Sequence, residues 1–286
     1  PHPYKLLNES ATYGRAVHME EQGWKRKKQS LSTFAWAFRR LEEVEKGISG
    51  ILPVVMALLE DYDGKGQLHG LAIGYELATR VPDFMKRTGI AALLLASAKH
   101  HLVYKPDSPD RIELLDRAFA TCVLVQSIAG ASADEWWAMA DRVLVNFVYV
   151  GESVEAYGVL SLQIQWVCEK LGAGVSRMLR SFVGVVVRGL RWQAHGVEAV
   201  WKLHEVLVEQ LEALVDACPW RMHRYVEELV AALAVAWAGA EDRHGLCQSI
   251  LAVLGKLRTA PGAGERVNAC IARLNQSSTE PFFTSF

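Results

Sequence analysis

Apolar residues return every three or four positions along almost the whole chain, the spacing that places them on one face of an α-helix. The β-branched runs at 143–150 and 185–187 lie inside longer patterns of this kind, so their length favours helix over strand. The spacing predicts an all-α protein in which each helix buries one face. The clearest stripes are Ile51, Val54, Val55, Leu58 and Leu59; Leu68, Leu71, Ala72 and Tyr75; Trp136, Met139, Ala140, Val143, Leu144 and Phe147; Val175, Met178, Leu179, Phe182, Val183 and Val186; and Leu246, Ile250, Val253, Leu254 and Leu257.

Short breaks separate these helical patterns. Pro82 is placed to open a brief helical turn that Gly89 closes. Helices of roughly 12–20 residues joined by short turns form antiparallel pairs, and about five or six pairs fit the length. Pairs that cannot bury their apolar faces alone stack into an α-solenoid, and weak self-similarity at roughly 40 residues is typical of HEAT and armadillo arrays. We therefore expect a HEAT/armadillo-like α-solenoid, with a globular helical bundle as its rival.

The chain divides into three unequal parts. Residues 31–275 are expected to form a single helical array. Residues 1–30 precede it as a lead-in or as the fragment of a missing region, since the chain begins at Pro1 without an initiator methionine. Residues 276–286 form a C-terminal aromatic tail.

The charge balance argues against a nucleic-acid partner. The chain has 31 Lys and Arg against 32 Asp and Glu, so it lacks the basic excess that such binding usually needs. The basic run at 25–28 could serve nuclear import, but a solvated helix start or loop is the preferred interpretation. The longest apolar run, 229–240, is shorter than the roughly 18 residues of a membrane span and is predicted to be a buried helix.

Catalytic signatures are weak. Five cysteines without a CxxC pair are expected to be reduced core thiols in a cytoplasmic and nuclear protein. The strongest enzyme candidate is the acidic stretch from Glu60 to Asp63, which resembles the aspartate-rich helix of terpene synthases. Its fifth position is Gly64 instead of a carboxylate, so it supplies half a magnesium site. No HExxH, phosphate loop, GxSxG or dinucleotide fingerprint is present, and we expect no catalytic activity, cofactor or metal.

Aromatic side chains divide into two groups. Most tryptophans lie within helix stripes and are expected in the core: Trp36, Trp136, Trp166, Trp201 and Trp237. The others are harder to place inside and are candidates for an interface, because exposed aromatics often anchor protein contacts. These are Trp24, Trp220, Phe282, Phe283 and Phe286.

Residues 51–106 resemble the Tel-two-interacting protein two family, a subunit of the Triple-T complex. The family's "ILPPLLxLLDDY" helix is matched from Ile51 to Tyr62, its Lys- and Gly-bearing helix by Lys65 with Gly70, and its "RTGL" turn by residues 87–90. Its closing "L-Y-P" corner is matched by residues 102–106. Weaker matches flank this region at Trp24, at residues 32–38, and at residues 217–221 with the helix that follows them and ends near Trp237. Glu60 for Asp and Val54 for Pro depart from the family pattern, and this divergence suits a filamentous fungus.

The resemblance implies a HEAT-repeat scaffold without catalytic activity. In that family the subunit joins two larger helical-repeat proteins, Tel-two and Tel-two-interacting protein one. With the ninety-kilodalton heat-shock chaperone, the complex matures and stabilises the phosphatidylinositol-three-kinase-related kinases of DNA-damage and nutrient signalling. Alternatives are another helical-repeat adaptor, such as a transport or phosphatase scaffold, and an α-helical metal-dependent enzyme.

Partner contacts are expected on the side chains that the helix stripes leave outward. The acidic corner is predicted to face solvent, so that charge reversal at Asp61, Asp63 or Arg87 weakens complex formation without unfolding the chain. The candidate partner-binding residues are Asp61, Tyr62, Asp63, Lys65, Arg87, Tyr104, Trp220, Phe282 and Phe283.

Overall fold

The computed structural model describes residues 29–106, 110–151, 153–193, 198–240 and 243–277, and within them it contains fourteen α-helices, one 3₁₀ helix and no strand. The first seven are α2 (Ser30–Arg40), α3 (Val44–Leu59), α4 (Gly64–Arg80), α5 (Pro82–Thr88), α6 (Ile90–Lys99), α7 (Arg111–Ala129) and α8 (Ala133–Tyr149). The others are α9 (Val154–Leu171), the 3₁₀ helix η2 (Gly172–Arg177), α10 (Leu179–Leu190), α11 (Glu198–Ala217), α12 (Pro219–Met222), α13 (Val226–Gly239), α14 (His244–Thr259) and α15 (Gly264–Ser277). The all-α prediction is confirmed.

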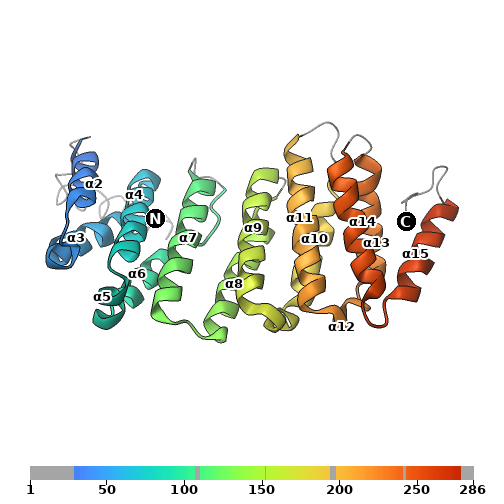
Figure 1. Ribbon diagram of the computed structural model, residues 1–286. Helices are drawn as coiled ribbons and strands as arrows, with labels where there is room; N and C mark the ends of the chain where they lie inside the picture. Colours follow the sequence, from blue (N-terminus) through green and yellow to red (C-terminus); the bar gives the residue numbers. More distant parts are fainter. Residues whose placement is uncertain (1–28, 107–109, 152, 194–197, 241–242, 278–286) are drawn as a thin grey trace, which may run out of the picture.

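The helices stand in two layers that run the length of the molecule (Figure 1). Helices α4, α7, α9, α11 and α14 form the front layer in this view, and each packs on the next. Helices α3, α6, α8, α10 and α13 form the back layer, and each packs against the front helix that follows it in the chain. This arrangement of five antiparallel pairs is the solenoid that the sequence predicts.

The five pairs recur at a nearly constant interval. Successive front helices begin 47, 43, 44 and 46 residues apart, from Gly64 through Arg111, Val154 and Glu198 to His244. The back helices begin 46, 43, 46 and 47 residues apart, at Val44, Ile90, Ala133, Leu179 and Val226. This period lies at the upper end of the range for HEAT and armadillo repeats. The repeat is structural, since the sequence shows no strict motif at this spacing.

Most predicted stripes are the buried faces of the helices. In α3, Ile51, Val55, Leu58 and Leu59 are buried, and the stripe of α14 from Leu246 to Leu257 is buried throughout. The apolar run at 229–240 lies in α13, a largely buried helix, as predicted. Pro82 begins α5, and Gly89 ends it with a positive φ of 75°, which also confirms the expectation for that turn.

The buried face of α4 differs from the one that the sequence predicts. Tyr75, placed in the buried stripe, is 44% exposed, whereas the buried face carries Gly66, Gly70 and Gly74 beside Leu71 and Leu77. A Cβ on Gly70 would lie 2.9 Å from the Cβ of Leu58 and 3.0 Å from the nitrogen of Leu59. Helix α4 therefore packs against α3 through glycines, which a search for apolar side chains does not detect.

Two further expectations need correction. Trp36 is 56% exposed on α2 and lies under the guanidinium of Arg40, because Phe38 is the residue that this helix buries. The stripe that begins at Val175 is not one α-helix: residues up to Arg177 form the 3₁₀ helix η2, and α10 begins at Leu179. Trp136 and Trp201 are buried as predicted, and Trp166 and Trp237 pack against the core while partly buried.

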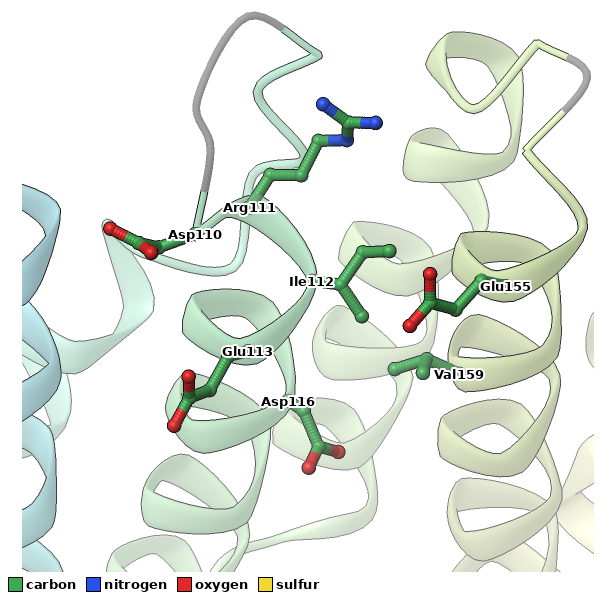
Figure 2. A pocket seen from close by; sticks show the side chains of 7 residues that line it. All are labelled: Asp110, Arg111, Ile112, Glu113, Asp116, Glu155 and Val159. Carbon is green, nitrogen blue, oxygen red and sulfur yellow. The ribbon is translucent and has the colours of Figure 1, made fainter.

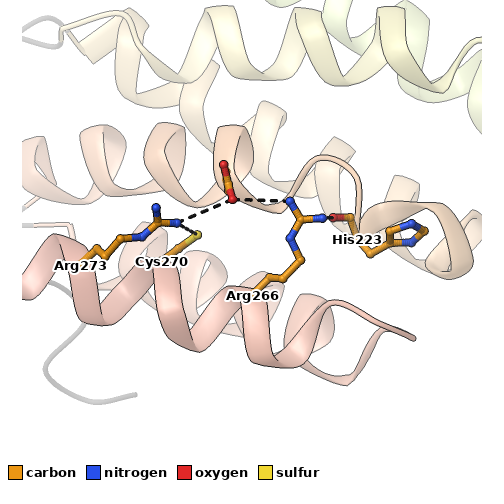
Figure 3. Close-up of polar contacts among 5 residues, drawn as sticks. His223, Arg266, Cys270 and Arg273 are labelled. Atoms are coloured by element: carbon orange, nitrogen blue, oxygen red, sulfur yellow. Dashed lines mark hydrogen bonds and ion pairs between the residues drawn. The ribbon is translucent and has the colours of Figure 1, made fainter.

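The last helix, α15, packs on α13 and α14 and is held by a cluster of arginines (Figure 3). The Arg266 guanidinium donates a 2.6 Å hydrogen bond to the carbonyl of His223 and lies 3.5 Å from the carboxylate of Glu227. Arg273 approaches the same carboxylate at 3.7 Å and also donates to the Cys270 sulfur. These contacts fix α15 as the end of the described array.

Candidate partner-binding surfaces

The acidic corner is the turn between α3 and α4. Asp63 is the N-cap of α4, where its side chain accepts a hydrogen bond from the backbone nitrogen of Lys65. The carboxylate of Asp61 accepts from the backbone nitrogen of Asp63, and its carbonyl accepts from the Gln67 side chain. The two aspartates of this turn therefore cap and stabilise the N-terminus of α4.

The two acidic residues differ in accessibility. Asp61 is only 8% exposed and is packed so tightly against α4 that a Cβ on Gly66 would lie 2.5 Å from its carboxylate oxygen. Its predicted position facing solvent is therefore wrong, and charge reversal at Asp61 would disturb the fold itself. Tyr62, Asp63 and Lys65 are exposed.

An open groove of about 410 Å³ lies between α7 and α9 (Figure 2). Ile112 and Val159 lie close together with the Glu155 carboxylate beside them, whereas Asp110 and Glu113 point to the other side of α7. The start of α7 lies close to the start of α4, because a Cβ on Gly64 would lie 3.1 Å from the Asp110 carboxylate. Its lining residues are Asp110, Arg111, Ile112, Glu113, Asp116, Glu155 and Val159.

The groove is not built as a metal centre. Among the residues that the structure describes, no three His, Cys, Asp or Glu side chains converge to hold an ion. Arg111 lies among the carboxylates, donates a 2.7 Å hydrogen bond to the carbonyl of Pro106, and approaches the ring of Tyr104. Carboxylates spread along two helices can attract a cationic side chain but do not enclose a hard cation.

Tyr104 holds the chain between α6 and α7 in place. Its ring is 4% exposed, and its backbone nitrogen donates a 2.9 Å hydrogen bond to the side-chain oxygen of Asn146 on α8. The same Asn146 amide donates a 2.8 Å bond to the carbonyl of Leu102. Burial places the Tyr104 ring out of a partner's reach, so the structure gives it a role in joining adjacent repeats.

The remaining candidates lie at separate places. Arg87 is exposed on α5, at the far end of α4 from the acidic corner. Those 17 residues of α4 span roughly 25 Å at 1.5 Å per residue. Trp220 is 73% exposed on α12, several repeats away. Phe282 and Phe283, like Trp24 and Phe286, lie outside the described residues. The predicted residues therefore do not form one site.

An apolar surface that the sequence reasoning missed lies on the back layer. Val145, Val148 and Tyr149 share one face of α8 and are 53%, 73% and 55% exposed. Val103 is 49% exposed, and Asn146 of α8 binds the backbone on both sides of it, which brings Val103 next to this helix. The signal was visible in the sequence: from Val143 to Val150, apolar residues occupy more than one helix face, although a partly exposed helix needs only one.

Arginines lie next to this apolar surface on α10. Arg180 and Arg188 are exposed on α10, and Arg191 is exposed at its C-cap. Arg177 in η2 lies 3.8 Å from the Asp134 carboxylate at the start of α8. The Arg188 guanidinium reaches the carbonyl of Phe147 at 3.5 Å, near the C-terminal end of α8. No acidic residue occurs from Leu171 to Val197, so this part of the back layer is positively charged.

Burial disfavours the charged forms of two thiols and two imidazoles in the core. Burial raises the pKa of the Cys122 and Cys168 thiols to about 12 and lowers the pKa of His101 from 6.5 to about 4. Burial also lowers the pKa of His204 on α11. Thiols with raised pKa values are poor nucleophiles, so these groups act as core residues. Cys218 and Cys270 are buried as well.

Among the described helices, none combines the length and the apolar character needed to cross a bilayer. Comparison with curated proteins and with solved structures finds no match. Comparison with protein families does find one: the Tti2 family model matches residues 6–192. The match covers residues 51–106, on which the resemblance was based, and extends through α2 to α10. The chain therefore belongs to the Tti2 family, the Tel-two-interacting protein two family that its sequence resembles.

Proposed function

We propose that the chain is a non-catalytic scaffold subunit of the Triple-T co-chaperone complex. It would bind Tel-two-interacting protein one and Tel-two, and with the 90-kDa heat-shock chaperone support the maturation and stability of phosphatidylinositol-three-kinase-related kinases. Membership of the Tti2 family supports this proposal. We further propose that the five helix pairs are HEAT-type repeats, in line with their period of 43–47 residues.

The observation that carries the scaffold role is the exposed apolar surface on the back layer. Val103, Val145, Val148 and Tyr149 each leave about half or more of their surface in water. Other large apolar side chains are exposed singly, such as Trp220 and Leu162, whereas three of these residues share one face of a single helix. Grouped exposure of this kind supports a protein-binding role more than scattered exposure does. A stable scaffold contact commonly buries more than ~2,000 Å². A rigid array meets that requirement at low conformational cost, because its helices are ordered before the partner binds.

The test is affinity purification of the tagged chain from its native cell extract, with bound proteins identified by mass spectrometry. We expect two large helical-repeat proteins in near-stoichiometric amounts and kinases of the named class in smaller amounts. Extract of cells that express the untagged full chain, processed in parallel, controls for non-specific capture. Recovery of a transport or phosphatase complex instead would identify another adaptor and contradict the proposal.

A further inference from the structure

We propose that the back layer docks an amphipathic helix whose apolar stripe is flanked by carboxylates. The surface, here termed the α8–α10 face, consists of Val103, Val145, Val148, Tyr149, Arg188 and Arg191. This inference rests on the proposed function, since it names the chemistry of the partner element that a scaffold of this shape would hold.

The apolar half of the face suits a helix. Val145, Val148 and Tyr149 stand at i, i+3 and i+4, so they form a short ridge along α8. A ridge of this kind packs into the groove between side-chain rows of a second helix. The ridge is firmly positioned, because Asn146 in the same turn joins α8 to the preceding connection by two buried hydrogen bonds.

The charged half of the face favours a partner that carries negative charge. Arg188 and Arg191 lie on the outward side at the C-terminal end of α10, and Arg188 reaches the last turn of α8. The Arg188 guanidinium donates a hydrogen bond to the carbonyl of Phe147. A carbonyl oxygen carries only a partial negative charge, so most of the positive charge of Arg188 is left for a partner's carboxylate. A carboxylate one turn beyond the partner's apolar stripe would meet both arginines.

A protein helix fits this face better than a nucleic acid does. Phosphate backbones are bound by cationic and polar side chains, whereas four of the six residues of this face are aliphatic or aromatic. The chain as a whole carries a net charge of −1, which gives no long-range attraction for a polyanion. The arginines therefore act as a rim around an apolar centre, the usual anatomy of a protein interface.

The first experiment is photocrosslinking within the full complex. We replace Val148 with p-benzoylphenylalanine in the full chain, co-express it with Tel-two-interacting protein one and Tel-two, and identify the crosslinked peptide by mass spectrometry. The matched control places the same residue at Leu162, which is 52% exposed on α9 in the front layer. We expect Val148 to crosslink a partner peptide that has helical apolar spacing and an Asp or Glu within one turn, and Leu162 not to crosslink that peptide.

The second experiment measures affinity for purified Tel-two-interacting protein one. Val148→Glu and Arg191→Glu should each weaken binding by about tenfold, and the effect of Arg191→Glu should shrink as salt is raised. Leu162→Glu and Arg117→Glu, exposed positions in the front layer, should stay within about twofold. Circular dichroism and thermal melting verify that each variant is folded.

The outcomes separate the inference from the function on which it rests. If the complex co-purifies but Val148 crosslinks a peptide without acidic residues, this chain's own residues 278–286, or a nuclease-sensitive species, the inference is overturned and the scaffold role stands. Equal losses from front-layer and back-layer variants would also overturn it. If neither large protein co-purifies, the proposed function is lost and the inference with it.

Discussion

Glycine at position 70 determines how closely the first helix pair packs. A helix normally gains about 0.5–1 kcal/mol when an interior Gly becomes Ala, because Gly loses more backbone entropy on folding. At Gly70 the new Cβ would meet backbone atoms of α3 at 3.0–3.2 Å, and backbone cannot turn aside as a side chain can. We therefore expect Gly70→Ala to lower the free energy of unfolding by roughly 1–3 kcal/mol. Urea denaturation followed by circular dichroism measures this change.

Gly158 in the interior of α9 provides the matched control. A Cβ there would meet nothing within 4 Å, so Gly158→Ala should raise the free energy of unfolding by about 0.5–1 kcal/mol. Opposite signs for the two substitutions would establish close packing as the cause. An equal gain at both positions would contradict the contact between α3 and α4 described here.

His101 makes stability depend on pH. Burial is the main cause that lowers its pKa to about 4, and Lys105 acts in the same direction, while a hydrogen bond with the backbone of Leu59 opposes them. Between the unfolded value of 6.5 and this folded value, the unfolded chain binds a proton that the folded chain does not. Stability therefore falls as pH drops through this window and levels off below it. From pH 7 to pH 5 the loss from this residue is about 2 kcal/mol.

The substitution that tests this is His101→Gln, which keeps a hydrogen-bonding side chain that does not titrate. Its difference in unfolding free energy between pH 7 and pH 5 should be smaller than that of the parent chain by about 2 kcal/mol. The exposed Leu162 on α9, which does not titrate, serves as control, and Leu162→Gln should leave the parent's pH dependence in place. The same pH dependence in parent and His101→Gln would assign the effect to other groups, such as His204.

At the scale of helices, sequence spacing predicts where an element lies better than how it faces. The stripes of α3 and α14 are largely buried as predicted, because large apolar side chains on one face leave a single orientation. The predicted stripe of α8 is also largely buried, although further apolar residues of that helix face solvent. Helix α4 could not be oriented from apolar side chains alone, since glycines lie beside Leu71 and Leu77 on its contact face, and the 3₁₀ turn at η2 has the same apolar spacing as a helix. The burial of Asp61 and Tyr104 could not be predicted from the sequence either. It depends on how the α3–α4 turn packs on α4 and how the α6–α7 connection packs on α8.

Asn146 on α8 joins one repeat to the next, and its removal tests that connection. It is 2% exposed and satisfies both the nitrogen of Tyr104 and the carbonyl of Leu102. Asn146→Ala leaves both backbone groups buried without that partner, so we expect stability to fall by roughly 2–4 kcal/mol. The exposed Asp141 on the same helix is the control, with an expected change within about 0.5 kcal/mol for Asp141→Ala. Hydrogen exchange at Tyr104 should accelerate in the first variant alone.

At the scale of the whole molecule, contacts join neighbouring repeats. The bonds from Arg243 to Glu198 and from Arg221 to Ser176 each span 45 residues, which is one repeat. The two layers also differ in chemistry: large exposed apolar residues gather on the back layer, whereas α7, α9 and α11 of the front layer carry many exposed carboxylates. The sequence predicts the helical array. It does not predict the difference between the layers, because the layer of each helix is set by how the helices pair in the folded chain.

An array with nearest-neighbour contacts should lose its order unevenly along its length. Leu211 is fully buried in α11, which packs against α9, α10 and α14, so Leu211→Ala should cost about 2–5 kcal/mol and reduce amide protection in all four helices. Val267 is fully buried in α15, whose main contacts are α13 and α14. Val267→Ala should therefore reduce protection chiefly in α15 and leave α7 to α11 unchanged, because opening the last helix breaks no contact further along the array. Hydrogen exchange with mass spectrometry distinguishes the two patterns. A uniform loss of protection in both variants would mean that the array unfolds as one cooperative unit, and that its scaffold surfaces depend on every repeat at once.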